Sequence, residues 1–187
     1  RNELWTGRLS NMKLSKTSLL SFVLITAIIS GCGAYSFTGA SIKDDVNSIS
    51  IAKFFNDVGG GPPNIEQTFT NDLQDYFQRN TNLELVPTGG DLQFEGAIIR
   101  YGIRPQAIAS SGSRDRADQS GLMRLTIAVQ TSFTNIKQEE DSFKKTFSFY
   151  ADYDPQATPI TQIEDDLIEE IFKQIIQDIF LASVAQW

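Results

Sequence analysis

The chain has 187 residues, 41% of them hydrophobic and 11% aromatic, which is enough for one ordinary hydrophobic core. It contains no histidine and one cysteine, which excludes Ser-His-Asp and Cys-His catalysis, histidine-ligated metals and an internal disulfide. The formal net charge of −7 argues against a nucleic-acid partner, because phosphate contacts need an excess of lysine and arginine. We therefore predict no nucleic-acid partner, no metal site and no cofactor.

The N-terminal part of the chain has the pattern of a signal peptide. Residues 1–11 precede Met12 and are interpreted as an upstream, non-native segment. A basic stretch and a short apolar run follow, and the run is too short to span a bilayer, which needs about 20 apolar residues. The run ends in Ile29-Ser30-Gly31-Cys32, which resembles the bacterial lipobox. Residues 12–31 are thus predicted to be a lipoprotein signal peptide, with Cys32 acylated as the new N-terminus.

An acylated Cys32 would hold the mature chain at a membrane surface. The segment Gly33-Ala34-Tyr35-Ser36 has no acidic residue. By resemblance to lipoprotein sorting signals, it lacks both the inner-membrane retention signal and the acidic surface-export tag. We therefore expect a lipid-anchored outer-membrane protein that faces the periplasm. The alternative is a buried free cysteine after a chance hydrophobic stretch.

The mature chain is predicted to hold one domain, because it has no internal repeat and no long linker. Residues 32–47 are interpreted as a lipidated, extended tether, and residues 48–187 as a single α+β domain. Removing residues 1–31 removes four basic residues and one acidic residue, so the mature net charge is −10. An anionic partner would therefore need a local basic patch.

The first half of the domain alternates between strands and one helix. Alternating isoleucines predict a strand over residues 48–54, and the glycines and prolines of residues 59–63 end it. Apolar residues then recur at helical spacing from Asn64, a candidate N-cap, to a helix end near Asn80. Residues 83–86 predict a short strand.

The second half predicts three longer strands. Over residues 91–103 the apolar positions change parity around Gly96, which predicts a bulge or bend at that residue. Residues 110–120 are polar and predict a loop. Apolar residues alternate over residues 123–133 and again over residues 143–149, which predicts two half-buried strands.

The chain ends in a predicted long helix. Thr161 and Glu164 have the spacing of a capping box. The apolar stripe of this helix consists of Ile163, Leu167, Ile171, Ile175 and Ile179. The element order predicts an α+β fold in which two helices pack on one face of a mostly antiparallel sheet of about four to five strands.

The face of the sheet away from the helices is predicted to be polar. It carries hydroxyl, amide and basic groups: Arg124, Thr126, Gln130, Ser132, Thr146, Ser148 and Tyr150. This pattern fits either a binding surface or an ordinary solvated face of an antiparallel sheet.

Five arginines are concentrated in one segment of the sequence. They are Arg100, Arg104, Arg114, Arg116 and Arg124, in a segment with only two acidic residues. Arginine forms bidentate contacts to phosphate and keeps its charge at any relevant pH, so these residues are candidate ligand-binding groups. The alternative is that each pairs with a nearby acid or lies over the edge of the sheet.

Several short segments, in this order, resemble the LptE lipopolysaccharide-assembly lipoproteins in their Bacteroidetes-like form. They are the lipobox with Gly33-Ala34-Tyr35-Ser36-Phe37, Ser48-Ile49-Ser50-Ile51, Phe54-Phe55-Asn56, Gln67-Thr68-Phe69 to Leu73, Thr81-Asn82-Leu83, and Gly90-Asp91-Leu92-Gln93-Phe94-Glu95-Gly96. The resemblance implies a non-enzymatic subunit that acts with an LptD-type outer-membrane β-barrel in the transport and assembly of lipopolysaccharide. Of the functional residues, it carries over Cys32.

Two other functions stay open on the sequence. One is a different periplasmic outer-membrane lipoprotein, which would bind or scaffold peptidoglycan or another barrel. The other is a hydrolase that uses paired carboxylates from Asp165, Asp166, Glu169 and Glu170. Because these acids are expected in the first turns of a helix, where they suit the helix dipole, a solvated helix face explains them better.

Overall fold

The computed structural model describes residues 42, 45–106 and 121–184. The elements in chain order are β1 (Ser48–Ile51), β2 (Phe55–Asn56), α2 (Ile65–Asn80), β3 (Glu84–Leu85), β4 (Leu92–Pro105), β5 (Met123–Asn135), the short 3-10 helix η2 (Glu139–Asp141), β6 (Phe143–Tyr153) and α3 (Ile160–Val184). The predicted signal peptide, Cys32, most of the predicted tether and the loop over residues 110–120 lie outside the described residues.

The strands form one six-stranded sheet in the order β3-β1-β4-β5-β6, with β2 also paired to β4. β1 runs parallel to β3 and β4, and β2 runs parallel to β4. Only the β4–β5 and β5–β6 pairs are antiparallel. The parallel pairs arise because α2 returns the chain to the end of the sheet where β1 begins. The sheet is therefore mixed, whereas the sequence predicted a mostly antiparallel one.

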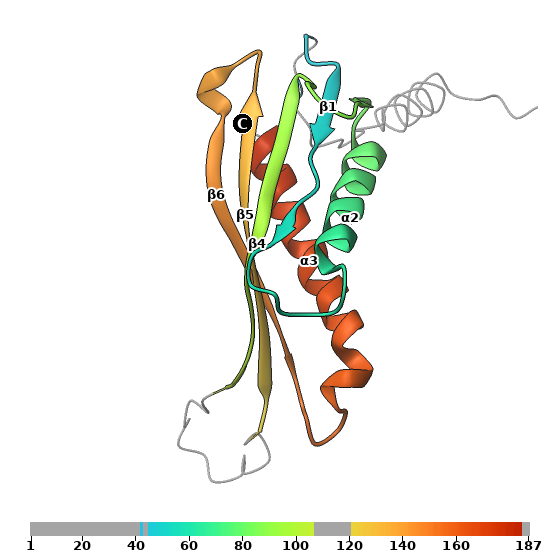
Figure 1. The fold of residues 1–187 in the computed structure, drawn as a ribbon, viewed down its shortest axis with the longest axis vertical. Helices are drawn as coiled ribbons and strands as arrows, with labels where there is room; N and C mark the ends of the chain where they lie inside the picture. Colours follow the sequence, from blue (N-terminus) through green and yellow to red (C-terminus); the bar gives the residue numbers. More distant parts are fainter. Residues whose placement is uncertain (1–41, 43–44, 107–120, 185–187) are drawn as a thin grey trace, which may run out of the picture. The chain divides into compact units, whose positions relative to one another are not determined.

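Both helices lie on the same side of the sheet, as the sequence predicted (Figure 1). The core between the layers is aromatic: Phe54 meets Phe69 edge to face at 5.0 Å between ring centroids, and Phe69 meets Phe172 at 4.9 Å. Edge-to-face pairs of buried rings add about 0.5–1.5 kcal/mol beyond their buried area. Phe69 from α2 and Phe172 from α3 therefore join the two helices and the sheet in one core.

β4 changes face within its length, but at Ile99 and not at Gly96. The β4–β5 register shifts between Ile98 and Arg100, which makes Ile99 the extra residue of a β-bulge. Ile98 is fully buried under the helices, and Tyr101 returns to the core side after the bulge. The change of face was predicted correctly; its position was wrong.

Gly96 is needed for a different reason. A Cβ at this position would collide with the backbone oxygen of Gln130 and would lie 2.5 Å from the ring of Phe54. The missing side chain lets the Phe54 ring lie directly on β4. The sequence pattern around Gly96 thus has two separate causes. The Phe54 ring packs closely on Gly96, and a bulge at Ile99 changes which residues face the core.

The helix ends differ from the predicted caps. Asn64 is the N-cap of α2, but its backbone oxygen, not its side chain, accepts from the amides of Gln67 and Thr68. α3 begins at Ile160, so Thr161 lies inside the helix. Glu164 instead accepts a hydrogen bond of 2.5 Å from the Tyr101 hydroxyl on β4. The capping-box prediction is therefore wrong, because Thr161 is not the N-cap and the Glu164 carboxylate binds Tyr101.

No helix within the described ranges is long and apolar enough to cross a membrane.

Candidate functional site: the open face of the sheet

The register of the long strands places the predicted polar residues on one face, the open face, which the helices do not cover. Three cross-strand rows of β4, β5 and β6 define its basic end. These rows are Arg104–Arg124–Asp152, Gly102–Thr126–Tyr150 and Arg100–Ala128–Ser148. Farther along the same face, Gln130 lies opposite Thr146 and Ser132 lies opposite Lys144. All seven residues predicted for this face therefore lie on it.

The Arg124 side chain is bound by other side chains of the same chain. Its Nε donates to Oδ1 of Asp152 at 2.6 Å, and its NH2 donates to Oδ2 at 2.7 Å. Its guanidinium lies 3.5 Å from the centroid of the Tyr150 ring, and the side-chain oxygen of Gln106 faces it in the orientation that satisfies both groups. The hydrogen bonds to Asp152 raise the pKa of Arg124, and the same contact lowers the pKa of Asp152. The charge of Arg124 is thus balanced locally.

Arg100 and Arg104 have a different environment. Both are exposed, and within the described residues neither forms an ion pair with an acid. Gly102 lies between them on the same face, and a Cβ there would meet no atom within 4 Å. Within the described ranges, two arginines without an acidic partner therefore flank a position without a side chain, and their Cα atoms lie about 13 Å apart along the strand.

The predicted arginine cluster is therefore divided by the structure. Arg100, Arg104 and Arg124 share one face, with Arg104 directly opposite Arg124 across the strands. Arg114 and Arg116 lie outside the described residues. Of the three arginines that the structure places, Arg100 and Arg104 are exposed, whereas Arg124 contacts Tyr150 and Asp152.

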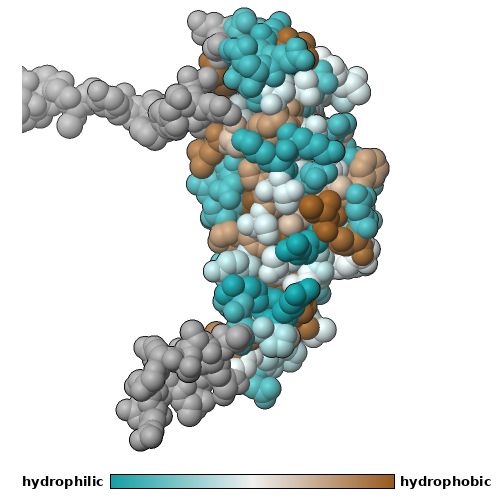
Figure 2. Space-filling model, turned by 90° about the vertical axis from the view of Figure 1, so that its left-hand side faces the viewer, coloured by the Kyte–Doolittle hydropathy of each residue, from teal (hydrophilic) through white to brown (hydrophobic). Residues whose placement is uncertain are grey.

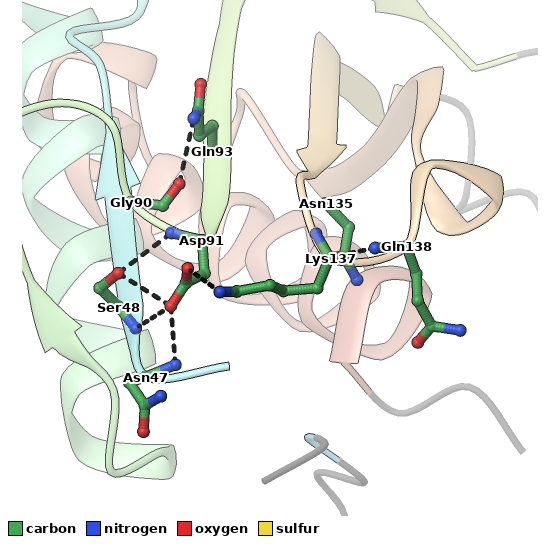
Figure 3. A network of polar contacts seen from close by, with 8 residues as sticks. All are labelled: Asn47, Ser48, Gly90, Asp91, Gln93, Asn135, Lys137 and Gln138. Carbon is green, nitrogen blue, oxygen red and sulfur yellow. Dashed lines mark hydrogen bonds and ion pairs between the residues drawn. The ribbon is translucent and has the colours of Figure 1, made fainter. Parts of the chain in front are cut away.

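A polar network fixes the point where the chain enters the domain (Figure 3). Oδ2 of Asp91, at the start of β4, accepts from the amides of Asn47 and Ser48 at 2.9 and 3.1 Å and from the Ser48 hydroxyl at 3.1 Å. Its Oδ1 pairs with Lys137 Nζ at 3.2 Å. The Asn47 amide is the main cause that lowers the pKa of Asp91 to about 2; Lys137 and Ser48 add to it, and burial opposes it. One carboxylate thus ties β1, β4 and the turn after β5 together.

A groove of about 820 Å³ lies between α2 and α3, on the other side of the sheet. Its floor includes Ile168 and Phe172, and its walls carry acidic groups from both helices: Asp72, Asp75, Asp165 and Glu169. Burial, and then the charges of Asp75 and Glu169, raise the pKa of Asp72. Arg79 from α2 and Lys173 from α3 also line the groove, so both helices present acidic and basic groups to it.

The helix acids differ from their predicted setting. α3 begins at Ile160 and has no acidic residue in its first turn, so the dipole does not explain Asp165, Asp166, Glu169 and Glu170. All four are exposed, and Asp165 and Glu169 line the open groove rather than an enclosed cleft. Within the described residues, no group of acidic residues and cysteine has the arrangement of a metal site.

Two of these features were missed by the sequence reasoning. Asp72 has no signal in the sequence, because its setting depends on how α2 and α3 pack. Asp91 follows two glycines at a strand start, and such a position can predict a carboxylate that caps backbone amides. Its partners, however, lie more than 40 residues away along the chain.

The fold and the open face together define a small α+β domain with one helix-covered face and one polar face. The family model for LptE, described as lipopolysaccharide-assembly, matches residues 46–183. The chain belongs to this family, which confirms the resemblance seen in the sequence. A comparison with curated proteins gives no match.

Solved structures with a similar architecture have very different sequences. One is the hypothetical protein CT253 from Chlamydia trachomatis, at 8% identity and a TM-score of 0.51, covering 75% of this chain and 99% of that one. A minor lipoprotein from Acinetobacter baumannii has 14% identity and a TM-score of 0.45, and the match covers 72% of this chain and 90% of that one. The rare lipoprotein B from Shewanella oneidensis has 14% identity and a TM-score of 0.42, and the match covers 73% of this chain and 90% of that one.

Proposed function

We propose that this chain is a lipid-anchored outer-membrane subunit, attached through Cys32 and facing the periplasm, that acts with an LptD-type β-barrel in lipopolysaccharide transport. The observation that carries the proposal is the match of the lipopolysaccharide-assembly family model over residues 46–183, most of the part of the chain that follows Cys32. The lipobox that ends at Cys32 supports the anchor. The subunit works by binding and not by turnover.

The open face gives this function a contact surface for an anionic lipid. Arg100 and Arg104 are exposed guanidinium groups without an acidic partner in the described ranges, on a domain whose net charge is negative. Guanidinium makes strong bidentate contacts to phosphate. The rows of hydroxyl and amide groups beside them, from Thr126 to Ser132 on β5 and from Thr146 to Tyr150 on β6, suit the hydroxyl-rich part of such a ligand. Arg114 and Arg116, which lie outside the described residues, stay candidate ligand-binding groups.

Copurification from native membranes in detergent tests the partnership. The wild-type chain should carry a large β-barrel protein with it at a constant ratio. A matched sample with Cys32→Ser tests the anchor at the same time, since it should lose acylation and membrane attachment. Retention of peptidoglycan or a different barrel, in place of a lipopolysaccharide translocon, would show that the chain is another kind of outer-membrane lipoprotein.

Mass spectrometry of the mature N-terminus tests the anchor directly. The expected result is an acylated Cys32 as the first residue. An unmodified chain that begins at Met12 in native membranes would contradict the anchor without deciding the barrel partnership.

A further inference from the structure

Among the described residues, the last strand of the sheet has a long unpaired edge. β6 pairs with β5 from Phe143 to Tyr153, and the described part of the chain places no strand on its other side. The opposite edge of the sheet is β3, which has only two residues. Natural proteins blunt exposed edges with short strands, prolines, bulges or charges. β6 has 11 residues without proline or glycine, and its register with β5 is unbroken.

The charges on β6 are confined to its ends. Lys144 and Lys145 lie near the start and Asp152 lies near the end, whereas residues 146–151 are uncharged and rich in strand-forming side chains. Figure 2 looks at the side of the domain on which β6 lies in Figure 1, and it shows hydrophobic and intermediate residues interspersed with hydrophilic ones along its middle. The middle of this edge is therefore suited to pairing with another strand.

The sequence of β6 is complementary to itself in antiparallel orientation. Ser148 is the midpoint of the strand, and residues at equal distances on its two sides share a face of the sheet. With Ser148 opposite Ser148 of a second copy, Lys144 lies opposite Asp152 and Thr146 lies opposite Tyr150 on the open face. On the helix side, Phe147 lies opposite Phe149. Opposite-charge and aromatic cross-strand pairs are the stabilising ones in sheets.

We propose that two copies of this chain pair antiparallel along β6, centred on Ser148, in a two-fold symmetric dimer whose sheet is continuous. This interface goes beyond the proposed function and does not rest on it. The centring on Ser148 pairs all 11 residues of the strand. A centre at Phe147 would place Lys144 opposite the uncharged Tyr150, and a centre at Phe149 would place it opposite Asp154, outside β6. Asp152 already binds Arg124, yet a carboxylate has acceptor sites for a second cation. A symmetric interface of this kind closes and does not form fibres.

Engineered cysteines test the register in the full chain with Cys32→Ser as background. Opposed Cα atoms of antiparallel strands are about 4.5–5.5 Å apart, which is within the range of a disulfide. Ser148→Cys alone should form a covalent dimer under mild oxidation. Thr146→Cys should form one only when it is mixed with Tyr150→Cys. Thr134→Cys, exposed on the same face but on the internal strand β5, is the matched control and should stay monomeric.

Sedimentation equilibrium tests the same interface without cross-links. Lys144→Glu places two acids opposite each other and should raise the dimer dissociation constant by about two- to fivefold or more. Lys173→Glu, exposed on α3, should leave it unchanged. A monomer at all concentrations, or Ser148→Cys that cross-links no better than Thr134→Cys, would overturn the proposal. So would cross-links from β6 to a different protein in membranes, which would assign this edge to that partner.

Discussion

Asp91 and Lys137 form an ion pair of 3.2 Å between the start of β4 and the turn that follows β5, beside the hydrogen bonds that Asp91 accepts from Asn47 and Ser48. The same carboxylate therefore holds the first residues of the domain and the far end of a long hairpin. If Cys32 anchors the chain in the membrane, the chain that leads from the anchor enters the domain next to this carboxylate.

Acid should weaken this contact in a defined pH range. Because the pKa of Asp91 is lowered from 3.8 to about 2 in the folded chain, its charged form stabilises the fold above pH 3.8, and that contribution is lost as the pH falls towards about 2. Asp91→Asn should lower stability at pH 7 and flatten the pH dependence between about pH 4 and 2. Urea unfolding at several pH values measures both effects. Glu95→Gln, exposed on the open face, is the control; an equal flattening there would contradict the assignment.

Lipopolysaccharide binding should depend on Arg100 and Arg104. Replacing both by alanine should weaken binding by roughly tenfold or more at low ionic strength and by less at high salt, where exposed charges are screened. Arg79→Ala is the control, since Arg79 is exposed on α2 and pairs with Asp75. Titration of the purified chain with lipopolysaccharide measures the effect.

The same titration separates Arg124 from its neighbours. Arg124→Ala should disturb Asp152 and Tyr150 and lower stability, with a smaller effect on binding than the Arg100 and Arg104 changes. Unchanged binding by the folded Arg100→Ala, Arg104→Ala double variant at low salt would remove the open face as the lipid contact.

Gly96→Ala should destabilise the domain by about 1–3 kcal/mol, because the new Cβ forces Phe54 and the β5 backbone apart. Gly102→Ala is a matched control on the same strand, where the Cβ meets nothing within 4 Å, and should change stability by less than about 0.5 kcal/mol. Urea unfolding of the two variants checks the prediction. Equal losses of stability in the two variants would show that the steric clash at Gly96 contributes nothing beyond the general effect of replacing a strand glycine.

Asp72→Asn should stabilise the chain at neutral pH. The pKa of Asp72 is raised by burial and then by Asp75 and Glu169, so its charged form is less favourable in the folded than in the unfolded chain. The gain should disappear when the pH falls below about 3.8, where the aspartate is protonated in both states. Thermal unfolding of Asp72→Asn beside Asp166→Asn, which does not line the groove, measures the difference.

The acids of α3 should be dispensable for function. Asp165→Asn combined with Glu169→Gln should leave outer-membrane assembly intact, because both side chains are exposed on the rim of an open groove. Complementation of a strain that lacks the chain measures this. Loss of function in a stably folded double variant would support the hydrolase alternative.

Apolar periodicity in the sequence is sufficient to predict α2, β5 and α3, because each buries one continuous stripe whose spacing follows from local geometry. The same alternation placed Arg124, Thr126 and Tyr150 on one face, since a regular antiparallel pair keeps its parity. The lipobox at Cys32 is likewise a property of the sequence alone.

Only the tertiary structure decided the parallel pairing of β1 with β4 and the position of the bulge at Ile99. It also decided that Arg124 pairs with Asp152, whereas Arg100 and Arg104 have no acidic partner among the described residues. Each depends on contacts between segments far apart along the chain, such as Asp152 beside Arg124 or Phe54 over Gly96. Local propensity carries no information about those neighbours. Burial of the common core selects them because the helices and strands must fit together as one packed unit.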